Sequence, residues 1–150
     1  MSKLCSNSDM RHISLAIKEA YKSTERFRHG CIAVASGKVV AKGFNYHRTY
    51  SNDGLIGRNC SCHAEIDVLR KCLKQNITKK INLYVTRISP DNSVRNSRPC
   101  FHCYDKMQLF NIKHIIYSDA NGDFIKEPLG DFTPTHLASG SRAMITNRTY

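Results

Sequence analysis

The sequence predicts an α/β fold, with a mixed sheet of about five strands and helices on both faces, in three α/β/α layers. Short runs rich in β-branched residues alternate with segments whose apolar residues recur at helical spacing. In the second half of the chain the order is strand, helix, strand, which implies a parallel pair joined by a right-handed crossover. The 150 residues have the length of one ordinary domain, so we expect residues 1–150 to form a single domain.

The N-terminal part of the chain has the pattern of one helix followed by a hairpin. The helix is predicted to begin at an N-cap formed by Ser8 or Asp9 and to end near His29-Gly30. Two short apolar runs, Cys31 to Ala35 and Val39 to Phe44, follow. A Ser-Gly-Lys turn separates them, and this arrangement favours a β-hairpin.

The rest of the chain supplies two further helices and three strands. The expected helices run from His63 to about Asn76 and from Pro99 to about Phe110. A buried central strand is expected from Ile81 to Ile88, with further strands at His114 to Tyr117 and, more weakly, at Phe124-Ile125. The helix that begins at residue 63 is apolar on most sides, which indicates that it packs against a sheet.

Two short signatures, about a third of the chain apart, contain the residue types that bind zinc. His63 starts one predicted helix, while Cys100 and Cys103 lie on the first turn of another, spaced so that both sulfurs share a face. Zinc takes imidazole nitrogen and thiolate sulfur in a tetrahedron, and a catalytic site keeps one position open for water. Glu65 lies two residues beyond His63, close enough to reach that water and move its proton without ligating the metal.

Other interpretations of nearby residues remain open. A closed structural zinc site would leave Glu65 as an ordinary acid at a helix start. His102 lies between the two cysteines and is expected on the exposed side of its helix rather than as a fourth ligand. His47, Cys60 and Cys62 raise the question of a second zinc, but their spacing matches no closed site.

The pattern His-x-Glu followed by Pro-Cys-x-x-Cys, at residues 63–65 and 99–103, resembles the signature of the zinc-dependent cytidine and deoxycytidylate deaminase superfamily. The resemblance covers Met10 to about Asp119, and residues 128–150 form a variable tail outside it. It implies a cytidine deaminase-like fold and hydrolytic deamination, in which zinc lowers the pKa of its water and Glu65 shuttles protons.

The resemblance also implies contacts with a substrate. In the family the backbone at the position of Ala64 holds the ring edge, and an Asn after the second strand contacts the sugar, a residue that Asn45 looks like. Tyr46 and Arg48 lie in the long loop that follows, and Arg98 lies in an insertion before the second signature. These three are expected to supply stacking and phosphate contacts.

The expected substrate is a free cytosine-containing nucleotide or nucleoside of the dCMP or cytidine type. One alternative is editing of cytosine or adenine within RNA or single-stranded DNA, which the formal net charge of +11 favours. Against it, the chain has no Trp and lacks the Trp-Ser-Pro-Cys form typical of polynucleotide cytidine deaminases. A further alternative is a non-catalytic zinc-containing protein that binds nucleic acid.

Composition also bounds partners and location. No apolar run approaches the ~18–20 residues of a membrane span, and the first ten residues are polar, so neither a membrane partner nor a signal peptide is expected. The seven cysteines are odd in number and two belong to the metal signature, which favours a reducing, cytoplasmic compartment. Family members are often dimers or larger, and the sequence leaves open whether this chain forms a homo-oligomer.

Overall fold

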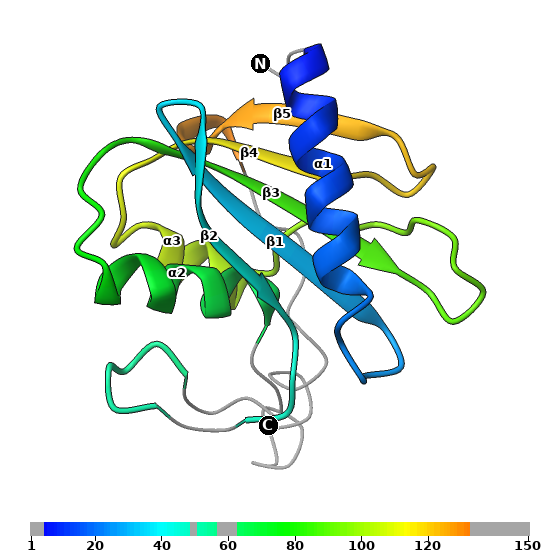
Figure 1. Cartoon of the computed structure of the whole chain (residues 1–150), viewed down its shortest axis with the longest axis horizontal. Helices are drawn as coiled ribbons and strands as arrows, with labels where there is room; N and C mark the ends of the chain where they lie inside the picture. Colours follow the sequence, from blue (N-terminus) through cyan, green and yellow to red (C-terminus); the bar gives the residue numbers. More distant parts are fainter. Residues whose placement is uncertain (1–4, 49–50, 57–62, 133–150) are drawn as a thin grey trace.

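The computed structural model describes residues 5–48, 51–56 and 63–132, which contain three α-helices, a short 3₁₀ helix and five strands (Figure 1). The helices are α1 (Asn7–Ala20), α2 (Ala64–Lys74), α3 (Phe101–Met107) and the 3₁₀ helix η1 (Leu129–Asp131). The strands are β1 (Arg28–Ala35), β2 (Lys38–Phe44), β3 (Ile81–Ile88), β4 (Ile112–Ser118) and β5 (Phe124–Pro128).

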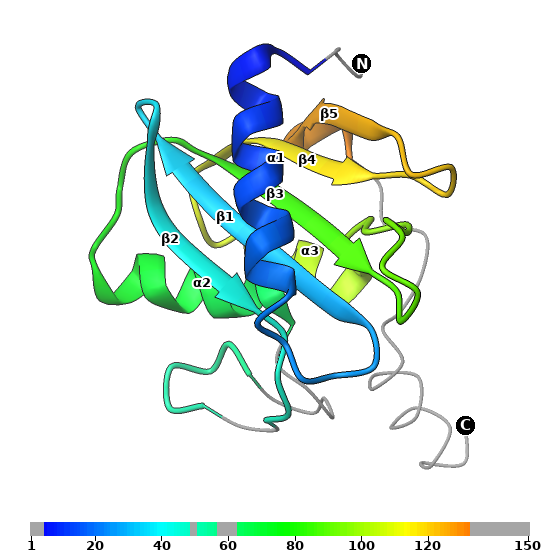
Figure 2. The ribbon, with the colours of Figure 1, turned by 45° about the vertical axis from the view of Figure 1, so that its right-hand side comes forward.

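The strands form one mixed sheet in the order β2-β1-β3-β4-β5. The pair β3–β4 is parallel, and the other neighbouring pairs are antiparallel. Helix α1 covers one face of the sheet, while α2 and α3 cover the other (Figure 1, Figure 2). The predicted α/β/α layers, the hairpin and the parallel crossover are therefore confirmed.

Side chains of the central strands alternate between two cores. The core under α1 contains Ile13, Ala16, Ile32, Val34, Tyr84 and Ile116. The larger core, under α2 and α3, includes Cys31, Ala33, Val68, Leu83, Val85 and Met107. Because successive residues of β1 and β3 alternate between these cores, both strands are buried on both faces, as predicted for the strand at residues 81–88.

Helix α1 begins and ends earlier than predicted. Its N-cap is Ser6 rather than Ser8 or Asp9: the Ser6 hydroxyl accepts the Asp9 N–H at 3.1 Å, and the Asp9 carboxylate accepts the Ser6 N–H at 2.9 Å. This reciprocal pair is a capping box. The predicted end near His29-Gly30 is wrong, because the helix stops at Ala20 and the later segment already pairs with β3.

Gly30 marks a close contact between α1 and β1. A Cβ atom at Gly30 would lie 2.0 Å from the carbonyl oxygen of Ala16 and 2.5 Å from the amide nitrogen of Ala20. The helix therefore rests directly on the strand backbone, an approach that only glycine allows. In the sequence Gly30 is typical of a helix end, whereas in the structure it is the point where α1 contacts β1.

Helix α3 is shorter than the predicted range of 99–110. After Met107 the chain tightens, with the Leu109 N–H donating to Lys106 and the Phe110 N–H donating to Met107, each at 3.1 Å. These bonds are of the 3₁₀ type and turn the chain so that β4 can begin at Ile112.

The connection between β3 and α3 is hydrogen-bonded to the sheet. The Arg95 N–H donates to the carbonyl of Arg87, and the Ser97 N–H donates to the carbonyl of Ser118, both at 2.9 Å. The Ser97 hydroxyl also donates to the Val85 carbonyl at 2.7 Å. The predicted insertion before the second metal signature is thus fixed to β3 and β4, and this fixes where α3 begins.

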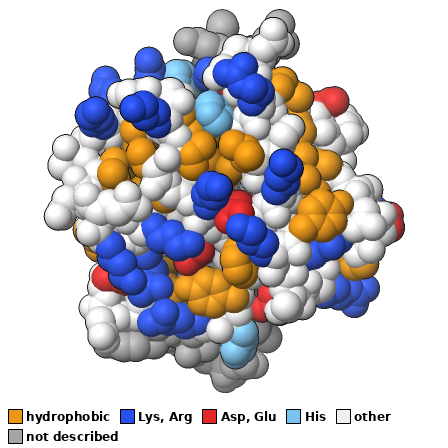
Figure 3. Space-filling view, viewed as in Figure 1, with side chains coloured by type: hydrophobic (Ala, Val, Ile, Leu, Met, Phe, Trp, Pro, Cys, Tyr) orange, Lys and Arg blue, Asp and Glu red, His pale blue; other side chains and the backbone are white. Residues whose placement is uncertain are grey.

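Charged side chains are dispersed over the face of the molecule on which α1 lies. Lys and Arg side chains are spread across this face, with a few acidic ones among them (Figure 3). None of the helices within the described ranges is long and apolar enough to cross a membrane.

Candidate metal centre and active site

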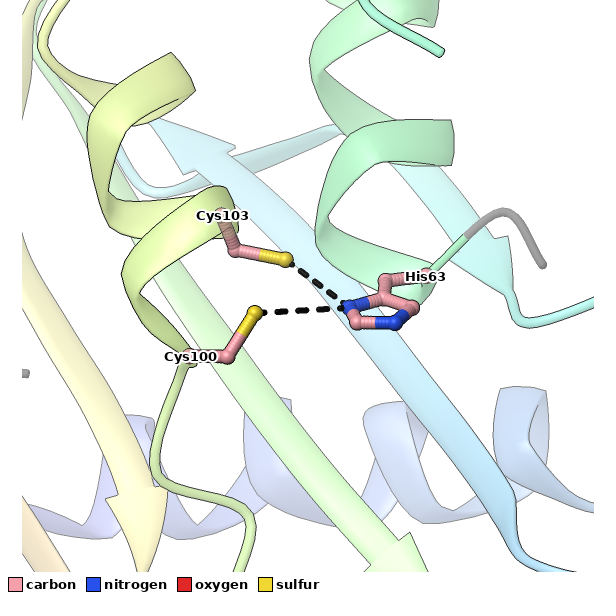
Figure 4. A group of neighbouring side chains, drawn as sticks. All are labelled: His63, Cys100 and Cys103. Atoms are coloured by element: carbon pink, nitrogen blue, oxygen red, sulfur yellow. Dashed lines mark hydrogen bonds between the residues drawn. The ribbon is translucent and has the colours of Figure 1, made fainter. Parts of the chain in front are cut away.

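The three predicted zinc ligands come together where two helices begin. His63 is the N-cap residue of α2, Cys100 is the N-cap residue of α3, and Cys103 lies in the first turn of α3. Neither N-cap side chain bonds back to its own helix. Figure 4 shows both sulfurs directed at the His63 ring instead.

The separations between these side chains fit one metal ion. The His63 Nδ1 atom lies 3.1 Å from the Cys103 sulfur and 3.8 Å from the Cys100 sulfur. One ligand atom from each residue lies within 4.8 Å of the others. Ligands of a tetrahedral zinc, at about 2.0–2.3 Å from the metal, are roughly 3.5 Å apart. One imidazole and two thiolates are also the donors that zinc prefers, so His63, Cys100 and Cys103 are positioned to hold it.

The two cysteines differ in their proton affinity. The Cys100 sulfur accepts a hydrogen bond from the Cys103 thiol, which lowers the pKa of Cys100. Burial would raise this pKa, but the hydrogen bond and the nearby His63 outweigh it and bring the pKa to about 3. The same hydrogen bond, together with burial, raises the pKa of Cys103. Of the two cysteines, Cys100 is thus the one that more readily forms a thiolate, the form that ligates zinc.

Glu65 lies beside this cluster, in the first turn of α2. Its side chain is 3% exposed, and its Oε1 atom has no hydrogen-bond partner among the described residues. Burial raises the pKa of its carboxyl group. A buried carboxylate oxygen without a partner is costly in a folded protein, so this position is explained better by chemistry than by packing.

Two predicted substrate contacts, Asn45 and Tyr46, already hold parts of the protein. The Asn45 side chain accepts the His29 N–H at 2.8 Å and donates to the Phe27 carbonyl at 2.9 Å. The Tyr46 hydroxyl donates to a carboxylate oxygen of Asp67 at 3.2 Å. Both side chains thus fix the ends of β1 and α2, and a role in substrate binding stays a prediction.

The other three predicted contacts lie in different settings. Ala64 is fully buried at the start of α2, next to His63, whereas Arg48 is exposed. Arg98 donates to the Tyr117 hydroxyl at 2.7 Å, and its guanidinium lies 4.6 Å from the centre of the Phe132 ring. None of these contacts tests a role with substrate, so that role stays a prediction for each.

His102 differs from its prediction. It is half-buried rather than exposed, and its Nε2 atom is buried without a hydrogen-bond partner in the described part of the chain. The metal-binding group found among the described residues does not include it. Of the three residues considered for a second zinc, His47 is exposed. The other two, Cys60 and Cys62, lie outside the described residues.

Sequence reasoning missed His29. Its ring lies nearly parallel to that of His63, with the centres 6.5 Å apart and the planes 16° apart. Burial, together with the nearby His63 and Arg87, lowers the pKa of His29 to about 3, so the ring is neutral. The sequence predicts a helix end at His29, whereas the structure has His29 as the second residue of β1. Only the pairing of that strand brings it to the metal ligands.

A family model agrees with this geometry. The model for the "Cytidine and deoxycytidylate deaminase zinc-binding region" matches residues 6–119. No curated protein sequence gives a significant match to the chain.

Several solved structures share the fold. A dCMP deaminase from the cyanophage S-TIM5, in complex with dCMP and dUMP, has 20% sequence identity and a TM-score of 0.60, over 79% of this chain and 85% of the other. Cytidine deaminase from Burkholderia pseudomallei has 17% identity and a TM-score of 0.61, over 89% of this chain and 100% of the other. Cytidine deaminase from Mycobacterium leprae has 12% identity and a TM-score of 0.58, over 87% and 100%.

Proposed function

Because the chain belongs to the cytidine and deoxycytidylate deaminase family and is thus a zinc-dependent deaminase, we propose that it hydrolyses the amine of a cytosine-containing nucleotide or nucleoside. The observation that carries the proposal is the buried Glu65 carboxylate, whose Oε1 atom has no partner among the described residues, beside a three-residue metal site. A closed structural site would need a fourth protein ligand and would not need a buried carboxylate oxygen without a partner.

Each residue of the site has a distinct task in this proposal. His63, Cys100 and Cys103 hold the metal, which when bound acts as a Lewis acid that lowers the pKa of a water molecule. Glu65 accepts a proton from the attacking water and delivers protons to the ring nitrogen and to the departing amine. The C–N bond breaks, ammonia leaves, and the cytosine ring becomes a uracil ring. The backbone of Ala64 holds the edge of the ring, beside the metal ligand that precedes it.

Replacement of Glu65 by Gln tests the proposal. The variant keeps the shape of the side chain but cannot take up a proton, so we expect product formation to fall by ~10²-fold or more. Zinc content and fold should not change. The assay is mass spectrometry of uracil-containing products after incubation of zinc-loaded protein with dCMP, deoxycytidine, cytidine or a single-stranded oligonucleotide.

A matched carboxylate-to-amide change supplies the control. Asp123→Asn alters an exposed acid in the turn before β5 and should leave turnover as in the wild type. Wild-type protein that is loaded with zinc and converts none of these compounds would contradict the proposal. Equal turnover in the wild type and in Glu65→Gln would contradict the role of Glu65. The panel also decides between a free substrate and the alternative of editing within a nucleic-acid strand.

A further inference from the structure

A second feature lies beside the metal centre, at the end of β3. We name it the arginine groove and define it by Arg26, Phe27, Arg87, Asp91 and Arg95, which line a surface cavity of about 480 Å³. Both ribbon views place the end of β3 and the loop that follows it beside the connection from α1 to β1 (Figure 1, Figure 2). The groove is therefore built from two segments that are about sixty residues apart in the sequence.

His29 connects the arginine groove to the metal centre. In the β1–β3 pairing His29 lies opposite Arg87, and Cys31 lies opposite Val85. Side chains two residues apart share a face of a sheet, and Cys31 and Val85 belong to the core under α2 and α3. His29 and Arg87 therefore lie on the face that carries the metal ligands. The His29 ring is 6.5 Å from the ring of His63, and His29 lies opposite Arg87 in the strand pairing. His29 is therefore the side chain that lies between the metal ligand His63 and the arginine groove.

Positive charge in the arginine groove exceeds what the protein neutralises. Three guanidinium groups face one carboxylate, and Asp91 makes its ion pair with Arg95 at 3.3 Å. Partial burial and repulsion from Arg95 lower the pKa of Arg87. The Arg87 Nε atom is buried and has no hydrogen-bond partner among the described residues. An anion in the groove would offset this repulsion and desolvation.

The guanidinium groups are also held in place. Arg87 lies over the Phe27 ring, 4.5 Å from its centre, and Arg26 lies 5.6 Å from the same ring. A stacked guanidinium loses little further freedom on binding, and its fork of N–H groups fits phosphate oxygens. One Nη atom of Arg87 donates to the Asn96 carbonyl at 3.5 Å. Guanidinium groups restricted in this way are suited to charge-assisted hydrogen bonds with an anion.

We propose that the arginine groove binds a phosphate group of the substrate while the base occupies the metal centre. This inference rests on the proposed function and makes it more specific, because it favours phosphorylated substrates over free nucleosides. The phosphate has two sources with the same chemistry: the monoester of a free nucleotide, and the diester of a neighbouring nucleotide in a strand. Phe27, which is 38% exposed, offers a stacking edge in the second case.

Steady-state kinetics of Arg87→Gln and Arg95→Gln test the inference. We compare dCMP, deoxycytidine and a short single-stranded oligonucleotide that contains one cytosine. One charge-assisted hydrogen bond corresponds to roughly a tenfold effect or more, so KM for the phosphate-bearing substrate should rise by about that factor. KM for deoxycytidine should not change. Arg95→Gln alters an exposed side chain and tests the groove even if Arg87→Gln lowers stability.

Arg11→Gln is the matched control, since it removes the same charge from an exposed position on α1. A rise in KM confined to dCMP identifies a nucleotide monoester as the ligand. A rise confined to the oligonucleotide, with a steep dependence on salt, identifies a strand. Unchanged KM for both phosphate-bearing substrates in the Arg87→Gln, Arg95→Gln double variant would overturn the inference.

A binding measurement separates this inference from the proposed function. Fluorescence polarisation of a labelled oligonucleotide, and titration calorimetry with dUMP, need no turnover and can be carried out on Glu65→Gln. If the double change abolishes binding of the oligonucleotide or dUMP on the Glu65→Gln background, the groove is supported even where the zinc-loaded wild type converts no compound of the panel, and that second result alone would contradict the proposed function. Normal turnover with unaltered phosphate binding in the double variant would support the proposed function and contradict the groove.

Discussion

Single side chains decide whether the metal centre forms. Cys100 and Cys103 are both buried, at 4% and 0% exposure, yet two other buried cysteines, Cys31 and Cys72, have no place in the metal-binding group. The sequence alone distinguishes the ligand cysteines from the core cysteines, because two cysteines three residues apart at a helix start have both sulfurs on one face. It did not indicate His29, since no local pattern relates that residue to His63.

Replacement of Cys100 by Ala should remove the metal and lower stability. The variant retains two of three protein ligands, and metal binding is coupled to the folded state, so we expect zinc content to fall well below one per chain and the Tm to decrease. Metal analysis and thermal unfolding with and without a chelator measure both effects. A chelator should lower the Tm of the wild type but not that of Cys100→Ala.

The matched change Cys72→Ala removes the same sulfur from the core of α2. It should cost stability through lost packing while zinc content remains that of the wild type. Full zinc content in Cys100→Ala would mean that Cys100 is not a ligand.

At the scale of elements, local sequence patterns predict the strands and turns that depend on neighbouring residues alone. The hairpin and the strand at residues 81–88 followed from β-branched runs and a turn, and the structure has them at these positions. The ends of α1 did not follow, because Ser6 competes with Ser8 and Asp9 as a cap and only the capping box selects among them. Gly30 looked like a helix end because its contact with α1 depends on how helix and strand pack.

Asp9 ties α1 to the sheet and makes stability depend on pH. Burial alone would raise its pKa, but hydrogen bonds from the Tyr84 hydroxyl and from Ser6, and the ion pair with Lys126, lower it to about 2. The folded pKa is below the ordinary value of 3.8, so the stabilisation is present above about pH 4 and is lost as the pH falls towards 2. The shift corresponds to about 2 kcal/mol.

We therefore expect Asp9→Asn to reduce the free energy of unfolding by about 2 kcal/mol at pH 7 and by clearly less at pH 3. Urea unfolding of both proteins at the two pH values provides the comparison. A difference that stays constant with pH would show that the charge of Asp9 contributes nothing.

Gly30→Ala probes the contact between α1 and β1. The added Cβ would meet the Ala16 carbonyl at 2.0 Å, so the helix must move away from the sheet, at a cost of about 3 kcal/mol. Gly130→Ala, where a Cβ atom meets nothing within 4 Å, is the control and should change little. Chemical denaturation measures both variants, and equal stability of the two would contradict the proposed close contact.

At the scale of the whole molecule, the order of elements was predictable and the pairing of strands was less so. Helices at residues 64–74 and 101–107 begin where the metal signatures are, so the sequence alone could bring the ligands together. The arginine groove could not be predicted, because Arg26 and Arg87 meet only through the β1–β3 register and the course of the loop after β3. Long-range register is the information that local periodicity lacks.

Helix α3, whose start carries both cysteine ligands, lies in the crossover between the parallel strands β3 and β4. His63 is 37 residues from Cys100 and 40 from Cys103, and the second helix of the site belongs to the crossover between these two strands. Contacts between such distant segments form slowly, because a long chain must close before they stabilise anything. During synthesis, a chain that has emerged only as far as β3 has one ligand and no metal site. The centre with all three ligands therefore requires α3, which follows β3 in the chain, so the part of the chain up to β3 cannot hold the metal with the full set of ligands.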